Sequence, residues 1–202
     1  MKIGILTINS TNSPTENLQD YAGSRLDLSY LSKAKEALEV LGHQAEVVSI
    51  DHTDVNMLGK LGYDVFLNFC FEGFKEESEF EPHVAAALDV VGVPYTGADF
   101  LSIAMSLDKV LTKKLLLCHG VPTPKFQEFV TGEELLNPKL KFPMIVKPAR
   151  QDGSIGIRGD AVVRNEDQLR ELVKRAIKNY KQPALAEEYI EGRELIVAMM
   201  CN

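Results

Sequence analysis

The sequence predicts an α/β fold whose first part is a doubly wound α/β domain. One observation is a set of short runs that are apolar on both parities and rich in β-branched residues, which suits strands buried on both faces of a parallel sheet. Another is that segments with apolar residues at helical spacing lie between these runs. The resulting order in the first half of the chain is strand, helix, strand, strand, helix.

The first strand is expected at Lys2–Ile8. Residues 9–24 are rich in Ser, Thr, Asn and Pro and are expected to form a long loop. Apolar residues then recur at helical spacing from Leu28 to Leu41, and Gly42 marks the end of that helix. The other elements of this part are two strands and a helical segment, at Gln44–Ile50, Tyr63–Asn68 and Val84–Val91.

The second part of the chain alternates strand and helix more loosely. It follows a turn at 94–97, where we place the first domain boundary, and begins with one helix over Ser106–His119. Four strands and a helix are expected at Lys125–Val130, Met144–Lys147, Asp160–Val163, Ala184–Tyr189 and Glu166–Tyr180. The run Glu194–Cys201 has the pattern of a strand that stops abruptly, which predicts a truncated domain; a terminal strand that completes a sheet is the alternative.

Composition limits the classes of partner. The formal net charge of −7 disfavours non-specific nucleic-acid binding, which depends on Lys and Arg neutralising phosphates. The three cysteines include no CxxC pair, and their odd number fits no closed disulfide framework. The chain shows no signal-peptide pattern and no apolar stretch of about 20 residues. We therefore expect a cytoplasmic protein with neither nucleic acid nor membrane as its partner.

Common nucleotide and metal motifs are absent from the sequence. The first strand is followed by Asn9-Ser10-Thr11-Asn12, where a dinucleotide-binding protein would carry GxGxxG. There is no GxxxxGK[ST] and no HExxH either.

The segment 145–157, IVKPARQDGSIGI, could form a phosphate cradle. A buried strand delivers Lys147, Pro148 ends it, and a loop with glycines follows. Glycines let backbone N–H groups approach an anion, and Ser154 would add a hydroxyl donor. A hairpin with a glycine turn and a surface lysine explains the same segment equally well.

Two further clusters suggest nucleotide contacts. Residues 187–194, EEYIEGRE, could supply a backbone donor for adenine and carboxylates for an amine and a ribose, although short acidic runs are usually solvated. Lys109 lies near a helix start, where a cation opposes the helix dipole; this suggests a bound anion, but exposed exceptions are common.

The order and separation of these clusters resemble the D-alanine–D-alanine ligase branch of the ATP-grasp family. The segments that carry the resemblance are VGVPYTGADFLSIAMSLDKVLTKKLLLCHGVPTP, FPMIVKPARQDGSIGI and AEEYIEGRELIVAMM. The resemblance implies a Rossmann-like pre-ATP-grasp substrate domain over residues 1–96 and the N-terminal α+β lobe of an ATP-grasp fold over 97–186. Residues 187–202 would be the hinge and first strand of a truncated C-terminal lobe.

The resemblance also implies the role of each site residue. Lys109 and Lys147 match the two lysines that contact ATP phosphates. The matches to the phosphate-covering loop are Gly153, Ser154 and Gly156. The matches to the adenine hinge and the ribose carboxylate are Glu187, Glu188, Ile190 and Glu194. ATP would phosphorylate a carboxylate, and an amine would attack the acyl phosphate. Mg²⁺ is expected to bind only with ligands from a domain after residue 202.

The substrate side departs from the dipeptide-forming members. Residues 68–77, NFCFEGFKEE, lack the family's histidine, and the family's first-helix glutamate aligns best with Asp27. Ser154, Arg150 and Asp27 are expected at the catalytic centre, with Glu72 as another candidate for substrate contact. The substrates are expected to be small amino acids or carboxylates, and a homodimer is a further expectation. The alternative classes are a nucleotide-binding module without catalysis, a degenerate homologue and, less well supported, a periplasmic-type binding protein.

Overall fold

The computed structural model describes residues 1–8, 29–157 and 159–197 of the 202-residue chain. The chain divides into two compact units. The first unit comprises residues 1–115 together with 149–156, and the second comprises 116–148 together with 157–202.

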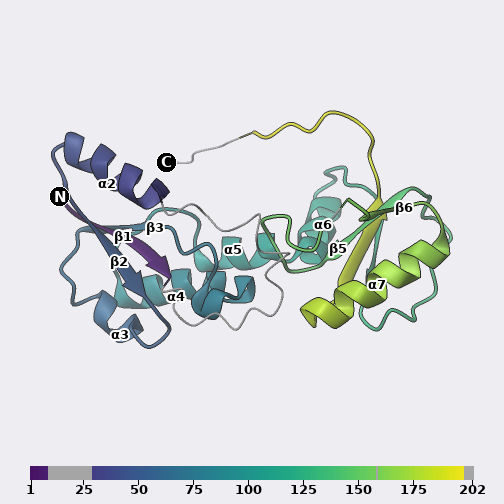
Figure 1. The fold of residues 1–202 in the computed structure, drawn as a ribbon, viewed down its shortest axis with the longest axis horizontal. Coiled ribbons are helices and arrows are strands. Elements are labelled where there is room, and N and C mark those ends of the chain that lie inside the picture. The colour runs from purple at the N-terminus through teal and green to yellow at the C-terminus, as the bar shows by residue number, and fades with distance from the viewer. Residues whose placement is uncertain (9–28, 158, 198–202) are drawn as a thin grey trace. The chain divides into compact units, whose positions relative to one another are not determined.

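The first unit contains a parallel three-stranded sheet with helices on both faces (Figure 1). Its strands β1 (Lys2–Ile8), β2 (Gln44–Ile50) and β3 (Val65–Asn68) are ordered β2-β1-β3. Helix α2 (Ser29–Val40) packs on the face that carries Ile5. Helices α3 (Val55–Leu58) and α4 (Glu81–Val91) pack on the face that carries Leu6. This layered arrangement agrees with the α/β fold that the sequence predicts.

Packing on the α4 face explains one glycine of the first strand. Gly4 pairs with Phe66 of β3 in the parallel register, and Phe66 is fully buried. A Cβ atom at Gly4 would lie 2.6 Å from the Phe66 ring, closer than real atoms approach. The close approach of a large aromatic ring therefore requires glycine at this position.

The helix expected from about Ser106 to His119 begins after Asp108 in the structure, and a separate helix that was not predicted precedes this residue. Helix α5 (Phe100–Leu107) ends there and α6 (Lys109–Cys118) begins at the next residue. Asp108 has an extended backbone, with φ −83° and ψ 97°, and its carboxylate accepts a hydrogen bond from the Leu111 N–H at 2.9 Å. An aspartate that caps the second helix in this way satisfies a backbone donor that a helix start leaves without a partner.

The second unit contains an antiparallel four-stranded sheet ordered β4-β7-β5-β6. The strands are β4 (Phe126–Phe129), β5 (Met144–Pro148), β6 (Val162–Val163) and β7 (Ala184–Glu188). Helix α7 (Glu166–Tyr180) packs on one face through Leu169, Leu172 and Val173. The strand residues on that face include Met144, Val146, Ala184 and Ala186, so the alternate residues point to the opposite face.

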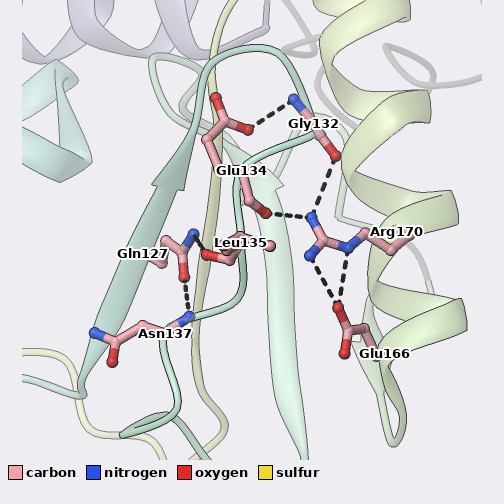
Figure 2. Close-up of polar contacts among 7 residues, drawn as sticks. All are labelled: Gln127, Gly132, Glu134, Leu135, Asn137, Glu166 and Arg170. Atoms are coloured by element: carbon pink, nitrogen blue, oxygen red, sulfur yellow. Dashed lines mark hydrogen bonds and ion pairs between the residues drawn. The ribbon is translucent and has the colours of Figure 1, made fainter.

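A loop over residues 130–137 is tied to α7 and β4 (Figure 2). The Glu134 carboxylate accepts hydrogen bonds from the backbone N–H groups of Val130, Thr131 and Gly132 at 2.8–2.9 Å. The Arg170 guanidinium donates to the carbonyl oxygens of Glu134 and Gly132 and pairs with Glu166 at 2.9 Å. The side chain of Gln127 bonds to the backbone of Leu135 and Asn137. Together these contacts hold the loop at both ends.

The end of the described chain differs from the expectation. Residues 194–197 form no strand, and Leu195, Ile196 and Val197 are 77%, 98% and 81% exposed. No strand in the described part of the chain pairs with them, which is the physical reason for the difference. The rest of the run, 198–201, lies outside the described residues. The described helices include none long and apolar enough to cross a membrane.

Candidate nucleotide-binding site

The antiparallel pair β5–β7 brings Lys147 and Glu187 together. In the register of these strands Ile145 is opposite Glu187 and Lys147 is opposite Leu185, so the lysine and the glutamate are diagonal neighbours. Both lie on the sheet face opposite α7, since they alternate with the residues of the helix-facing core. The Lys147 Nζ is 2.5 Å from the Glu187 Oε1. Two residues that are 40 positions apart in the sequence thus form one charged pair.

The surroundings of this pair are mostly protein. The side chain of Lys147 is 20% exposed and that of Glu187 is 11% exposed. Partial burial strengthens the attraction between the charges but removes hydration from both, so such a pair is weak evidence for stability. A shielded ammonium group held by a strand is chemically suited to an incoming phosphate, whose oxygens can take the place of the carboxylate.

The end of β7 and the residue after it are bonded to neighbouring segments, and the chain then becomes exposed. The Glu188 N–H donates to the Lys125 carbonyl at 2.9 Å, and the Tyr189 N–H donates to the Pro143 carbonyl at 3.0 Å. The Glu188 carboxylate is 3.8 Å from the Lys125 ammonium, which is 62% exposed, so this pair contributes little. Ile190 is 67% exposed and Glu194 is also exposed.

The loop expected to cover phosphates has three residues with positive φ. Gly153, Ser154 and Gly156 have φ of 53°, 63° and 78°. This left-handed conformation suits glycine, whereas Ser154 adopts it at a cost in strain. Ile155 is the buried residue of this stretch, and its N–H donates to the Asp152 carbonyl at 2.9 Å. The loop therefore has an apolar anchor between exposed or half-buried polar residues.

Lys109 and the start of this loop are joined within the first unit. The Lys109 N–H donates to the Ala149 carbonyl at 3.0 Å, and its ammonium group donates to the Gln151 carbonyl. The Arg150 Nε is 3.0 Å from the Asp108 Oδ2. The Asp108 carboxyl is partly buried, which opposes ionisation, but hydrogen bonds from the Leu111 N–H and from Arg150 lower its pKa overall. The break between α5 and α6 thereby places Lys109 beside the loop.

The expected site residues are divided between the two compact units. Lys109, Arg150, Gly153, Ser154 and Gly156 belong to the first unit. The group in the second unit consists of Lys147, Glu187, Glu188, Ile190 and Glu194. Lys147 is on a strand and Lys109 is at a helix start, as expected, whereas their shared contact with one nucleotide stays a prediction. Asp27 lies outside the described residues.

The acidic residues of the first unit were only partly anticipated. Glu72 is half-buried, and its charge contributes to raising the pKa of Tyr30 and Cys70 after the larger contribution from burial. Burial, Asp152 and Glu72 raise the pKa of Glu81 to about 7. Glu81 and Asp152 were not expected from the sequence, because no local pattern shows that residues this far apart meet. Within the described residues no group of three or more His, Cys, Asp or Glu side chains could hold a metal ion.

Comparison with known proteins finds relatives of this chain. Residues 115–202 match a family model described as D-ala D-ala ligase C-terminus. A D-alanine–D-alanine ligase of Moorella thermoacetica is 33% identical over 175 residues, which cover 82% of this chain and 54% of that protein. An uncharacterized protein y4sG of Sinorhizobium fredii is 43% identical over 131 residues, covering 65% and 38% of the two chains.

Solved structures resemble the fold of the chain. D-alanine–D-alanine ligase from Bacillus anthracis superposes with a TM-score of 0.66 at 22% identity, over 95% of this chain and 58% of that one. A structure of the same ligase complexed with ATP gives a TM-score of 0.66 at 23% identity, over 95% and 60%. The chain spans about half the length of the curated ligases it matches. With this mixed α/β fold and these matches, the chain belongs to the D-alanine–D-alanine ligase-like family.

Proposed function

We propose that this chain forms the nucleotide-binding part of an ATP-dependent carboxylate–amine ligase of the D-alanine–D-alanine ligase type. The observation that carries the proposal is the Lys147–Glu187 pair on adjacent strands, next to the segment 188–190. It joins a shielded cation suited to phosphate with a carboxylate suited to the adenine amine. In this proposal the first unit contains a Rossmann-like pre-ATP-grasp domain and the antiparallel sheet is the first lobe of an ATP-grasp fold.

The reaction has two steps. An oxygen of the substrate carboxylate attacks the γ-phosphorus of ATP, the bond to the β-phosphate oxygen breaks, and ADP leaves. The amine nitrogen of the second substrate then attacks the acyl carbon, inorganic phosphate leaves, and the nitrogen loses a proton. Lys147 and Lys109 would neutralise phosphate charge, while the N–H groups of Gly153, Ser154 and Gly156 and the Ser154 hydroxyl would orient the phosphates.

Within the described residues no three His, Cys, Asp or Glu side chains are grouped as metal ligands, and Mg²⁺ is expected only with a domain after residue 202. Mg²⁺ takes near-octahedral oxygen coordination, usually from one or two carboxylates, phosphates and water. We therefore assign no step of the reaction to a metal held by these residues. The alternative function is a nucleotide-binding module without catalysis.

The substrates are proposed by class. We expect small amino acids or carboxylates beside Arg150, Ser154 and Glu72, with Asp27 as a further contact. The segment after β3 has Phe69, Cys70 and Phe71 where a histidine is expected in the dipeptide-forming relatives, and Cys70 is buried. Because a changed polar contact can alter specificity strongly, D-alanine should be a poor substrate. The cytoplasmic location and a homodimer likewise stay predictions.

The test of nucleotide binding is a calorimetric titration of the chain with ATP. We expect Lys147→Ala to weaken ATP binding by about tenfold or more, because a charge-assisted contact to phosphate is lost. The matched control is Lys174→Ala. This lysine is on α7, also pairs with a glutamate, and belongs to the same unit. Equal affinity of Lys147→Ala and the wild-type chain for ATP would contradict the assignment.

The two candidate functions differ in phosphate release. A ligase should release phosphate from ATP in the presence of Mg²⁺ and an amino-acid mixture, and the release should depend on the amino acids. A binding module should retain ATP affinity without such release. The full-length protein is the appropriate sample, with Lys147→Ala as the control for contaminating ATPases.

A further inference from the structure

Ser78 connects the short helices of the first unit to the start of the Arg150–Gly156 loop, which is expected to cover phosphates. It begins the short helix η2 (Ser78–Phe80) and is 5% exposed. Its Oγ lies 3.4 Å from the Gln151 Oε1 and 3.3 Å from the Asp152 Oδ1, residues that follow it by more than 70 positions. A serine hydroxyl has one proton to donate, so it can donate to one of these oxygens at a time.

The position of this contact along the loop distinguishes it from the others. The ties from Lys109 and Asp108 reach residues 149–151. Ser78 also reaches Asp152, whose carbonyl accepts the Ile155 N–H and which directly precedes Gly153. Ser78 thus contacts the last residue before the segment with positive φ. Fixing that residue fixes the point from which residues 153–156 would move.

A carboxyl group lies in the same turn as Ser78, since the Glu81 backbone N–H donates to the Ser78 carbonyl. Glu81 begins α4, directly after η2, and burial, Asp152 and Glu72 raise its pKa to about 7. These carboxylates come from three segments: α4, the loop itself and the turn after β3. Cys70 also faces Glu81, and Lys75 on the short helix η1 (Phe74–Glu76) has its ammonium group 5.3 Å from the Phe80 ring.

The sign of the effect follows from the charges. Below about pH 7, Glu81 binds a proton and is neutral, so Asp152 can lie near it without repulsion. Above about pH 7, Glu81 ionises, and its charge at a half-buried position repels the charge of the exposed Asp152 carboxylate. We call the loop docked when Asp152 lies against Ser78, near Glu81. A docked loop therefore favours the protonated form of Glu81, and by linkage a proton on Glu81 favours docking.

We propose that Ser78 is a positioning residue that docks the base of the Arg150–Gly156 loop, and that a proton on Glu81 favours this docking. The docking itself stands on contacts within the first unit. Its consequence for ATP rests on the proposed function, because it assumes that residues 153–156 cover phosphates. Nucleotide affinity should then decrease as the pH rises through neutrality.

Amide hydrogen exchange of the nucleotide-free chain tests the docking. The readout is the peptide that contains Ile155, with a peptide from β1 as an internal reference for global stability. Each variant is compared with the wild-type chain at the same pH, so that the intrinsic pH dependence of exchange cancels. We expect Ser78→Ala to exchange about 2- to 12-fold faster at Ile155 at pH 6, corresponding to the loss of one net hydrogen bond, and β1 to be unchanged.

Three further variants sharpen the result. Ser78→Thr retains the hydroxyl and should restore part of the protection. Glu81→Gln removes the titrating group, so the ratio of protection at pH 6 to protection at pH 8, corrected for intrinsic rates, should approach one. Ser106→Ala is the control, because Ser106 is an exposed serine whose hydroxyl donates to a backbone carbonyl elsewhere in the unit.

Each part of the proposal has a result that would overturn it. Unchanged Ile155 exchange in Ser78→Ala, or faster exchange in β1 to the same degree, would overturn the positioning role. A pH dependence that persists in Glu81→Gln would overturn the role of the proton. In a parallel titration with ATP, affinity should fall in Ser78→Ala by a similar factor. Failure of the wild-type chain to bind ATP would overturn the nucleotide consequence and the proposed function, while the exchange data would still decide the docking.

Discussion

Two loops of this chain differ in how their backbone N–H and carbonyl groups are hydrogen-bonded. The loop 130–137 of the second unit is held by the Glu134 carboxylate, the Arg170 guanidinium and the Gln127 amide, which all bond to backbone groups of the loop (Figure 2). The loop 149–156 of the first unit is tied at its start, by Lys109, Asp108 and Ser78. From Gly153 onward its apolar anchor is Ile155.

This difference separates a loop that is held in place by side chains from a loop whose backbone groups can bind a ligand. Side chains that saturate backbone N–H and carbonyl groups leave them no capacity for a ligand. Gly153, Ser154 and Gly156 instead combine positive φ with exposed or half-buried positions, which presents backbone groups to an anion. Low local stability is typical of segments that close on ligands.

The largest effect is expected from removing Arg170. This side chain donates to two carbonyl oxygens, pairs with Glu166, and has its guanidinium carbon 5.6 Å from the centre of the Phe129 ring. Arg170→Ala should lower the free energy of unfolding by about 3 kcal/mol, because two carbonyls lose their partner and the aromatic contact is lost. Urea unfolding followed by circular dichroism measures this.

The control for Arg170 is Arg175→Ala on the same helix. Arg175 pairs with Asp160 through a side chain that is 41% exposed. Exposed pairs contribute little, so this variant should change stability by no more than about 0.5 kcal/mol. Similar losses in the two variants would show that the bonds from Arg170 to the loop backbone do not fix it.

A smaller effect is expected from neutralising Glu134. Burial opposes ionisation of this carboxyl, but the backbone N–H groups of Thr131, Glu134 and Val130 outweigh it and lower its pKa to about 2, from an ordinary value of 4.5. Since the folded-state pKa is lowered, its stabilisation is present above pH 4.5 and is lost as the pH falls toward 2. Glu134→Gln should cost about 1–2 kcal/mol at pH 7.

The measurement for Glu134 is a pair of unfolding curves, one at pH 7 and one near pH 2.5. The difference between Glu134→Gln and the wild-type chain should shrink at the lower pH. The adjacent Glu133→Gln is a matched control, since its partner Lys174 is 57% exposed. A difference of constant size across this range would mean that the carboxylate charge does not hold the loop.

Much of the fold could be predicted from apolar periodicity. The strand that delivers Lys147 and the helix with Leu169, Leu172 and Val173 are found where their patterns predict them. Periodicity succeeds in these places because one face of each element is buried. The same information gives the strand positions of Lys147 and Glu187 separately. It does not give their 2.5 Å contact, because the β5–β7 register depends on pairing between strands far apart in sequence.

The missed features depend on long-range contacts. The helix break at Asp108 has a weak local signal, because one aspartate inside a helix costs only about 0.5 kcal/mol. The break accompanies the contact between Asp108 and Arg150, which are 42 positions apart. The contacts of Ser78 also depend on residues far away in the sequence, since its partners follow it by more than 70 positions. The domain boundaries near residues 97 and 187 stay a prediction.

The smallest effect on stability is expected from Ser154→Gly. This variant should have a separate effect on ATP binding. Ser154 has φ 63°, a conformation that costs a non-glycine residue about 1 kcal/mol. Glycine removes this strain in the folded chain but also loosens the unfolded chain, and the two changes nearly cancel. We expect stability within about 0.5 kcal/mol of the wild-type chain. ATP affinity should nevertheless fall severalfold, since one hydroxyl donor is lost.

Lys181→Gly is the matched control for this last comparison. Lys181 has φ 52° and caps the end of α7, in the unit that does not contain the loop. Both variants relieve a left-handed backbone, so their unfolding curves should be alike, whereas their ATP titrations should differ. If both variants bind ATP as the wild-type chain does, the Ser154 hydroxyl has no role in phosphate binding. If both lose affinity equally, the loss arises from backbone loosening in general. Only a loss confined to Ser154→Gly supports the distinction between a loop that is bonded internally and one that keeps its donors for a ligand.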